Sequence, residues 1–333
     1  MNKFALISFT ERGKALREKV AAALGGETGV FIEIFDKGAQ DAKTWVGEKF
    51  SARVPIVFIG AAGIAVRLIA PLVASKDKDP AVIVIDEAGR YVVPLLSGHI
   101  GGANALAARL AASLGARAVI TTATDINGVF AADAWAAENG CAIGDISNIK
   151  HVSSALLNGA PVGFHSDFPV NGGLPRGLIT GAADIGVCVS LDDKKRPFKT
   201  TLNVIPRIIT VGAGCRKAAD SRAFEEFIRD GLARNGVSLT AVEALASIDI
   251  KSGEDCMIKF AQKNNIEFVT YSAEELQAVE GEFASSGFVE KTAGVGNVCE
   301  RAAAKRGGRL IIRKTARGGM TLAAAARDWE CAF

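Results

Sequence analysis

The 333-residue chain has few of the side chains that build metal centres and disulfide scaffolds. Its six cysteines lie far apart and never form a Cys-x-x-Cys pair, which argues against a zinc ribbon, a thioredoxin-like motif or a disulfide framework. Only three histidines are present, His99, His151 and His165, so a multi-histidine metal cage has few ligands. We therefore expect no metal bound by the protein itself.

Nucleotide and nucleic-acid signatures are also missing. Neither the dinucleotide fingerprint GxGxxG nor a P-loop occurs, and aromatic residues, which stack on bases in RNA-binding modules, are only 7% of the chain. A net charge of +3, from 39 basic and 36 acidic residues, excludes a polycationic protein of the histone type. We expect no nucleic-acid partner.

Long hydrophobic runs are interrupted. The run 54–74 carries one charge, Arg67, but Pro55, Gly60, Gly63 and Pro71 divide it, so it predicts a strand, a glycine turn and a helix rather than a membrane span. The N-terminus lacks the pattern of a signal peptide. We expect a cytoplasmic, reduced protein with no membrane partner.

Short β-branched runs alternate with alanine-rich helical runs, which predicts an α/β fold. We expect open, mostly parallel sheets with flanking helices in an N-terminal and a C-terminal domain, and a small middle module between them. The expected boundaries are 1–130 for the N-terminal domain with glycine-rich strand-end loops, 131–200 for the middle module and linker, and 205–333 for the C-terminal domain with a basic run.

Two segments at predicted strand ends combine glycine with charge. Gly60 and Gly63 form a turn into a helix, where free N–H groups can hold an anion and Arg67 can pair with a carboxylate. A tight packing turn explains these glycines equally well. The next segment, DEAGR, places Glu87 after a buried strand, where it is either a general base or part of a solvated hairpin turn.

The segment SGHIGGAN gives the sharpest signal, because a strand runs into a glycine loop with a titratable imidazole. His99 has an ordinary pKa of about 6.5 and can move protons at neutral pH, and glycine amides at a helix start can stabilise an oxyanion. A histidine with purely structural hydrogen bonds is the alternative. The residues expected to bind a ligand here are Ser97, Gly98, Gly101, Gly102 and Asn104.

A further strand ends in TTATD, where Thr121, Thr122 and Asp125 supply hydroxyls and a carboxylate. Asp125 capping the next helix is the structural alternative. The loops converge only if their strands end at one edge of the sheet.

In the C-terminal half, the segment VGAGCRK contributes Gly212, Gly214 and Arg216 as candidate binding residues. We interpret Cys215 as a packing cysteine, because no histidine follows His165 in the chain. The segment 301–317 carries seven basic residues and no acid. It forms either a solvated face or a surface that attracts a polyanion. From it we select Arg313 and Lys314 as candidate substrate-binding residues.

The uninterrupted block from Gly60 to Asp125 resembles the cobalt-precorrin-5A hydrolase family (CbiG) of anaerobic cobalamin biosynthesis. The C-terminal half resembles the terminal domain of the same family. The matching segments there are VGAGCRK at 211–217, ASIDIKSGEDCMIKFA at 246–261, GVGNVCERAAA at 294–304 and KTARGGMTLAAAAR at 314–327.

The resemblance implies a hydrolase that opens the δ-lactone of a ring-contracted cobalt tetrapyrrole with water. It then releases acetaldehyde to give cobalt-precorrin-5B. The cobalt travels with this polycarboxylate substrate, so no separate cofactor is expected. A homo-oligomer and transient contact with other enzymes of the pathway both stay open.

We hypothesise that His99 transfers the proton, with Glu87 or Asp125 orienting it or acting as the base. Two other functions stay open. A corrinoid carrier would bind the tetrapyrrole without chemistry. A nucleotide- or phosphate-using α/β transferase would use the glycine turns at the strand ends.

Overall fold

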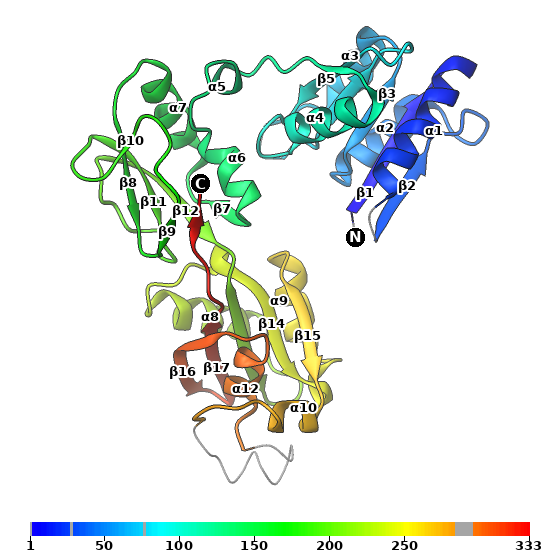
Figure 1. The fold of residues 1–333 in the computed structure, drawn as a ribbon. Coiled ribbons are helices and arrows are strands. Elements are labelled where there is room, and N and C mark those ends of the chain that lie inside the picture. Colours follow the sequence, from blue (N-terminus) through cyan, green and yellow to red (C-terminus); the bar gives the residue numbers. More distant parts are fainter. Residues whose placement is uncertain (1, 27–28, 76–77, 284–295) are drawn as a thin grey trace. The chain divides into compact units, whose positions relative to one another are not determined.

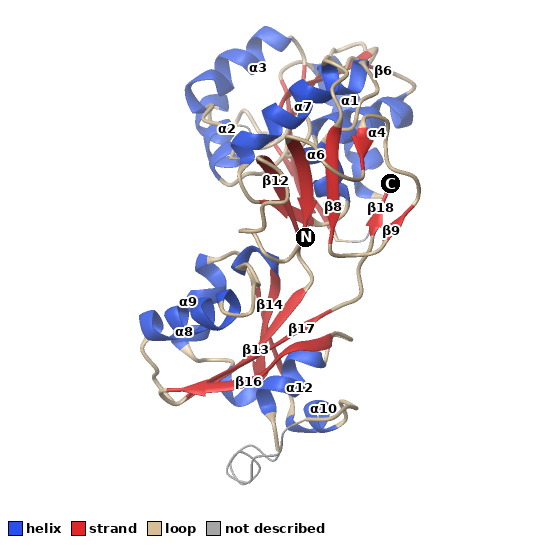
Figure 2. Ribbon diagram, turned by 90° about the vertical axis from the view of Figure 1, so that its left-hand side faces the viewer, coloured by secondary structure: helices blue, strands red, loops and turns tan. Residues whose placement is uncertain are grey.

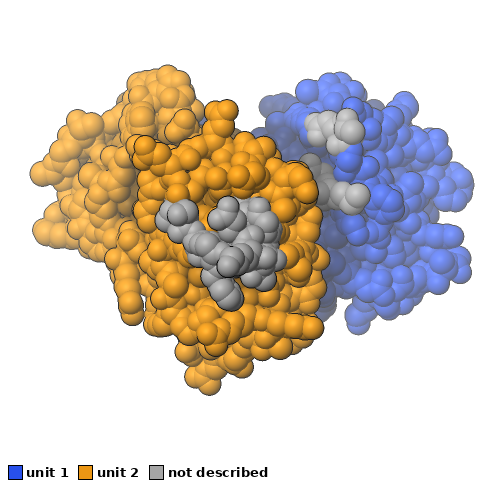
Figure 3. Space-filling view, turned by 90° about the horizontal axis from the view of Figure 1, so that it is seen from below, with its two compact units in different colours: residues 1–137, 156–159 blue, residues 138–155, 160–333 orange. Residues whose placement is uncertain are grey.

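The computed structural model describes residues 2–26, 29–75, 78–283 and 296–333. The segment 294–304 therefore begins with two residues outside the described part. Two compact units are present, residues 1–137 with 156–159 and residues 138–155 with 160–333 (Figure 3). Both units are α/β, which confirms the predicted fold class. Within the described residues, no helix is long and apolar enough to cross a bilayer.

The first unit contains a six-stranded sheet with the order β2-β1-β3-β4-β5-β6 (Figure 1). Its strands are β1 Asn2–Ser8, β2 Val30–Ile34, β3 Ile56–Ile59, β4 Val82–Ile85, β5 Tyr91–Leu96 and β6 Arg117–Ala118. Its helices are α1 Glu11–Gly25, α2 Ala42–Ser51, α3 Ala62–Ile69, α4 Ala103–Leu114, α5 Ala123–Ile126 and α6 Ala132–Glu138, with a 3-10 turn at Ala70–Leu72.

Helices cover both faces of this sheet. Alternate side chains of β1 and β3 point to opposite faces, so Leu6 and Val57 pack with α1 and α4, whereas Ile7 and Phe58 pack with α2 and α3. All four of these side chains are buried. A sheet with both faces covered needs the continuous apolar strands that the sequence shows.

One strand of the sheet runs against the others, and this decides where the loops lie. β1, β2, β3 and β4 are parallel, but β5 pairs antiparallel with β4, and Val82 lies opposite Leu96. The short β6 is parallel to β5. The loops after β5 and β6 therefore lie at the opposite edge from the loops after β3 and β4.

The second unit contains two larger sheets and a two-stranded one. The first has the order β10-β8-β11-β12-β7, the second β15-β14-β13-β17-β16, and β18 pairs with β9. The strands are β7 Cys141–Ile143, β8 Val162–Ser166, β9 Val170–Asn171, β10 Leu178–Ile179, β11 Ile185–Val189, β12 Thr200–Pro206, β13 Ile209–Cys215, β14 Val242–Ile248, β15 Glu267–Tyr271, β16 Arg309–Arg317, β17 Met320–Ala326 and β18 Cys331–Ala332. The helices are α7 Ile149–Leu157, α8 Ser221–Ala233, α9 Asp255–Lys263, α10 Ala273–Gln277 and α12 Val298–Ala304, with 3-10 turns at Ile146–Asn148, Leu239–Ala241 and Asp249–Lys251.

The C-terminal sheet is mixed. β13, β14 and β15 are parallel, whereas β17 and β16 join as an antiparallel pair. α8 and α9 cover one face, where Phe224 and Phe260 stack edge to face, and α12 covers the other (Figure 2). This layering places the ends of β13 and β14 beside the first turn of α9.

Candidate functional site

The loop between β5 and α4 is tightly wound, which explains its glycines. Ser97 adopts φ +57°, a left-handed conformation that is costly for a residue with a Cβ, and its Oγ donates to the Asp79 carbonyl at 2.8 Å. A Cβ at Gly101 would lie 2.4 Å from Ser97 Cβ, and one at Gly98 would lie 2.7 Å from Asn104 Oδ1. A larger residue at Gly101 would have to move the loop, and one at Gly98 would have to move the Asn104 side chain.

This loop places the His99 ring between two carboxylates. Nε2 lies 2.7 Å from Asp125 Oδ2, and Nδ1 lies 3.0 Å from Asp133 Oδ1. His99 comes from the loop after β5, Asp125 from the short α5, and Asp133 from the first turn of α6. The arrangement is a carboxylate–imidazole–carboxylate chain.

The two carboxylates differ in their exposure to solvent. The side chain of Asp133 is 8% exposed and that of His99 is 11% exposed, whereas that of Asp125 is 37% exposed. A ligand arriving from solvent therefore reaches Asp125 before it reaches the other two residues.

Asn104 helps to orient Asp125 and is itself bonded to Thr122. The amide Nδ2 of the buried Asn104 donates to Thr122 Oγ1 at 2.9 Å and to Asp125 Oδ2 at 3.2 Å. Thr122 is also the N-cap residue of α5. The contacts from Asn104 and His99 both fall on Oδ2, so Oδ1 takes part in neither of them.

The electrostatics make His99 a cation at neutral pH. The hydrogen bond to Asp133 raises the pKa of His99 from 6.5 to about 9, with a further contribution from Asp125 and against the opposing effect of burial. A protonated imidazole donates from both ring nitrogens, which is what two carboxylate partners require. At pH 7, His99 is therefore a cation that holds two aspartates in place by hydrogen bonds, rather than a free base.

The loop amides are used mainly within the loop. The N–H of Gly102 donates to the His99 carbonyl at 2.8 Å, and that of Asn104 donates to the Gly98 carbonyl at 2.9 Å. Gly102 has φ +77° and serves as the N-cap of α4. The nearby Thr121 is exposed.

Glu87 and the Gly60 turn lie at the other edge of the sheet. Glu87 follows β4 and accepts a hydrogen bond from Thr10, which follows the parallel β1. Gly60 follows β3, and its N–H donates to the Ile85 carbonyl at 2.9 Å. Glu87 therefore does not join His99 and Asp125, contrary to one expectation from the sequence. The physical reason is the reversed direction of β5.

The first turn of α3, which follows Gly60, is accessible to solvent. Gly63 is exposed, and its carbonyl accepts a hydrogen bond from Arg67 Nη1 at 3.2 Å. The guanidinium of Arg67 is itself exposed and lies at this edge of the sheet, on the helix after β3.

The candidate residues of the C-terminal half belong to the second unit. A Cβ at Gly212 would lie 1.8 Å from the Cys299 carbonyl oxygen, so this glycine allows α12 to pack on β13. A Cβ at Gly214 would lie 2.7 Å from Thr321 Oγ1. Both glycines therefore have a packing role. The exposed Arg216 donates its backbone N–H to Gly319.

Several residues of the basic run, 301–317, form hydrogen bonds or ion pairs with neighbouring residues. Arg313 Nη1 donates to the Glu282 carbonyl at 2.6 Å, and the backbone N–H of Lys314 donates to the buried Glu300 carboxylate at 2.8 Å. Arg306 pairs with Glu267 at 2.6 Å. Of the seven basic residues, Arg306 and Arg317 pair with carboxylates, of Glu267 and Asp230, which offset part of the positive charge of the run.

Sequence reasoning missed Asp133. The sequence feature that could have identified it is a carboxylate among apolar residues. Asp133 lies between alanines and close to Trp135, in the first turn of α6. Asp133 is only 6% exposed, and a buried carboxylate requires a hydrogen-bonding or charged partner.

Comparison with known proteins finds matches along most of the chain. Residues 44–125 match the family model "Cobalamin synthesis G N-terminal", residues 130–206 match "Cobalamin biosynthesis central region", and residues 209–325 match "Cobalamin synthesis G C-terminus".

Two curated relatives carry the same name. The chain is 36% identical over 321 residues to the cobalt-precorrin-5A hydrolase of Salmonella typhimurium, covering 90% of each chain. It is 28% identical over 305 residues to that of Priestia megaterium, covering 83% of this chain and 82% of the relative. Among solved structures, CobE, a protein from the cobalamin (vitamin B12) biosynthetic pathway, matches 37% of this chain and 92% of its own at 27% identity, with a TM-score of 0.34.

Proposed function

Because the chain belongs to the cobalamin biosynthesis G (CbiG) family, we propose that it hydrolyses cobalt-precorrin-5A. The observation that carries the proposal is the 36% identity to a curated hydrolase of that substrate across 90% of both chains. The substrate is then a cobalt-bearing tetrapyrrole with many carboxylates, and its cobalt enters and leaves with it.

The proposed reaction has two stages. Water adds to the lactone carbonyl and gives up a proton, the ring C–O bond breaks, and the released oxygen takes up a proton to become a hydroxyl. In the second stage the hydroxyl loses its proton as the neighbouring C–C bond breaks. Acetaldehyde leaves, and the electron pair of the broken bond passes into the macrocycle. Both stages need a base that solvent and substrate can reach.

Asp125 is the residue we propose as that base. It is the most exposed of the three linked side chains, and its Oδ1 takes part in neither hydrogen bond that orients the carboxylate. His99 is then a positioning residue, because both of its ring nitrogens are occupied by carboxylates. The sequence favoured His99 for proton transfer, and the paired geometry favours Asp125.

The test uses the purified protein and cobalt-precorrin-5A under anaerobic conditions. Acetaldehyde release and the mass of the tetrapyrrole product are followed for the natural protein and for Asp125→Asn. We expect kcat to fall about a hundredfold or more with little change in KM, since a general base contributes roughly 10²–10⁴-fold. The exposed Asp184, which pairs with the exposed Lys199, provides the control variant Asp184→Asn, and its activity should be unchanged.

The outcomes separate the candidate functions. Acetaldehyde release that is unchanged in Asp125→Asn would remove Asp125 as the base while leaving the hydrolase proposal intact. Tight binding of the tetrapyrrole by the natural protein without any acetaldehyde would instead favour a corrinoid carrier.

A further inference from the structure

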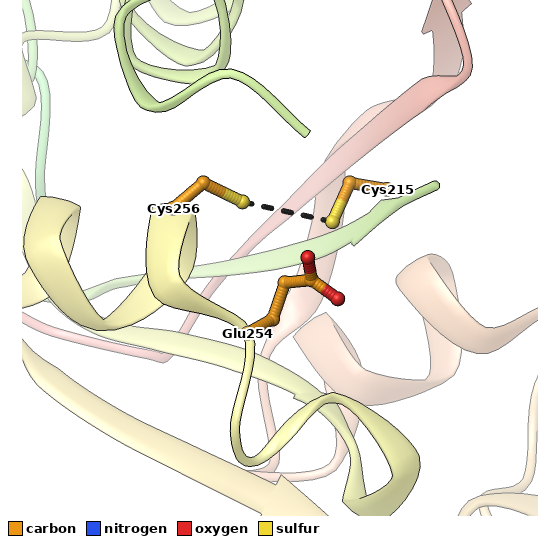
Figure 4. Close-up of side chains that lie close together, drawn as sticks. All are labelled: Cys215, Glu254 and Cys256. Atoms are coloured by element: carbon orange, nitrogen blue, oxygen red, sulfur yellow. Dashed lines mark hydrogen bonds between the residues drawn. The ribbon is translucent and has the colours of Figure 1, made fainter. Parts of the chain in front are cut away.

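Two cysteines that are 41 residues apart in the sequence come together in the second unit. Cys215 is the last residue of β13, and Cys256 lies in the first turn of α9. Their Sγ atoms are 3.7 Å apart, and both cysteines are free thiols. Figure 4 shows the carboxylate of Glu254, the N-cap residue of α9, beside the two sulfurs.

The spacing of these atoms fits a tetrahedral metal ion. Zinc–sulfur bonds of about 2.3 Å at the tetrahedral angle place two sulfurs about 3.8 Å apart. The observed separation is 3.7 Å, and the ligand atoms of Cys215, Glu254 and Cys256 all lie within 4.8 Å of one another.

Burial and access also suit a bound ion. Cys256 is 1% exposed and the Glu254 side chain is 9% exposed, whereas Cys215 is half-buried. An ion can therefore enter past Cys215 and be shielded from bulk water by the other two residues. Three protein ligands leave the fourth tetrahedral position for water or for a small external ligand.

The neighbouring charges balance when the ion binds. Both cysteines enter this charge balance as free thiols. Glu254 pairs with Lys251 Nζ at 3.0 Å and accepts the Ala218 N–H at 2.6 Å. A divalent ion that displaces two thiol protons leaves the total charge of this group unchanged.

We propose that Cys215, Cys256 and Glu254 bind one thiophilic divalent cation, with zinc as the probe. On binding, two S–H bonds break, two zinc–sulfur bonds form, and two protons pass to solvent. Glu254 accepts hydrogen bonds from Ala218 and Lys251, and a carboxylate has about four lone-pair positions, so it can also bind a metal. The site is separate from His99 and Asp125, which belong to the other unit, and does not depend on the proposed hydrolase activity.

The experiment titrates zinc into the reduced, metal-free full-length protein against a chromophoric chelator. We expect one zinc per chain, release of about two protons per zinc, and binding about a hundredfold weaker in Cys215→Ser and in Cys256→Ser. Glu254→Gln should bind about tenfold more weakly. Cys188 is another buried thiol of the same unit, so Cys188→Ser should bind zinc as the natural protein does.

Cobalt(II) provides a second measurement that does not depend on activity. Sulfur-to-metal charge-transfer absorption should appear for the natural protein and for Cys188→Ser, and should be weaker in Cys215→Ser at the same cobalt concentration, because only Cys256 then supplies a thiolate. Thermal unfolding of each metal-free variant establishes that it is folded. Zinc retained by a Cys215→Ser/Cys256→Ser double variant would overturn the proposal. So would a reducible disulfide between these cysteines together with no zinc uptake after reduction.

Discussion

The charge state of His99 allows the strongest test of the geometry in the first unit. With one carboxylate on each ring nitrogen, at 2.7 and 3.0 Å, the pKa of His99 rises from 6.5 to about 9, with the Asp133 hydrogen bond as the largest cause. The protein has only three histidines, so NMR of the ring protons resolves each one. The His99 signal, identified by its loss in His99→Gln, should stay at its protonated position through pH 7 and titrate near pH 9.

The same pKa has a consequence for stability. A rise from 6.5 to about 9 corresponds to about 3 kcal/mol, at about 1.4 kcal/mol per pH unit. Because the folded protein holds this proton more tightly than the unfolded chain does, the contribution is fully present below pH 6.5. It is lost as the pH rises through about 9. The free energy of unfolding of the natural protein relative to His99→Gln should therefore decrease by about 3 kcal/mol between pH 6 and pH 10.

Chemical denaturation at several pH values, followed for the first unit, measures this difference. Other groups that titrate in the same range are common to both proteins, so their contributions cancel. His151 is exposed and belongs to the second unit, so the control variant His151→Gln should leave the stability of the first unit unchanged. A His99 midpoint at or below pH 6.5, or a stability difference that does not change with pH, would refute the carboxylate–imidazole–carboxylate arrangement.

Two further predictions concern the second unit. Gly212→Ala should lower the free energy of unfolding by about 3 kcal/mol or more, because its Cβ would meet the Cys299 carbonyl at 1.8 Å and α12 would have to move. Gly253→Ala, with open space around the new methyl group, should change it by less than about 0.5 kcal/mol, and equal effects in denaturation would contradict this packing. Reversing the charges of Arg313 and Lys314 together should raise KM roughly three- to tenfold at low salt and less at high salt. A KM that does not change would show that the basic run is a solvated face.

Local structure followed from local sequence where short-range chemistry decides it. Thr10 is of a residue type that favours helix N-caps, and its side chain accepts the Gly13 N–H at the start of α1, which ends at Gly25. The apolar run 56–59 forms the buried β3. Caps, turns and apolar periodicity act over a few residues, so they can be recognised without knowing the rest of the fold.

Whether the four loops converge was left to depend on their strands ending at one edge of the sheet, and the structure shows that they do not. Only five residues, 86–90, separate β4 from β5, and so short a connection joins antiparallel strands, because a parallel pair needs a long crossover. The sequence therefore contained the signal that separates Glu87 from His99. Strand direction, rather than the identity of the loop residues, determined which of them meet.

The sequence by itself determined the α/β alternation, the glycine loop that carries His99, and the resemblance that led to a lactone-opening hydrolase. Only the tertiary structure brought the buried Asp133 to the second nitrogen of His99 and the sulfur of Cys256 to within 3.7 Å of that of Cys215. The physical reason is that the side chains of one loop come from consecutive residues and can be read directly from the sequence. Contacts between distant residues depend instead on how helices pack against sheets.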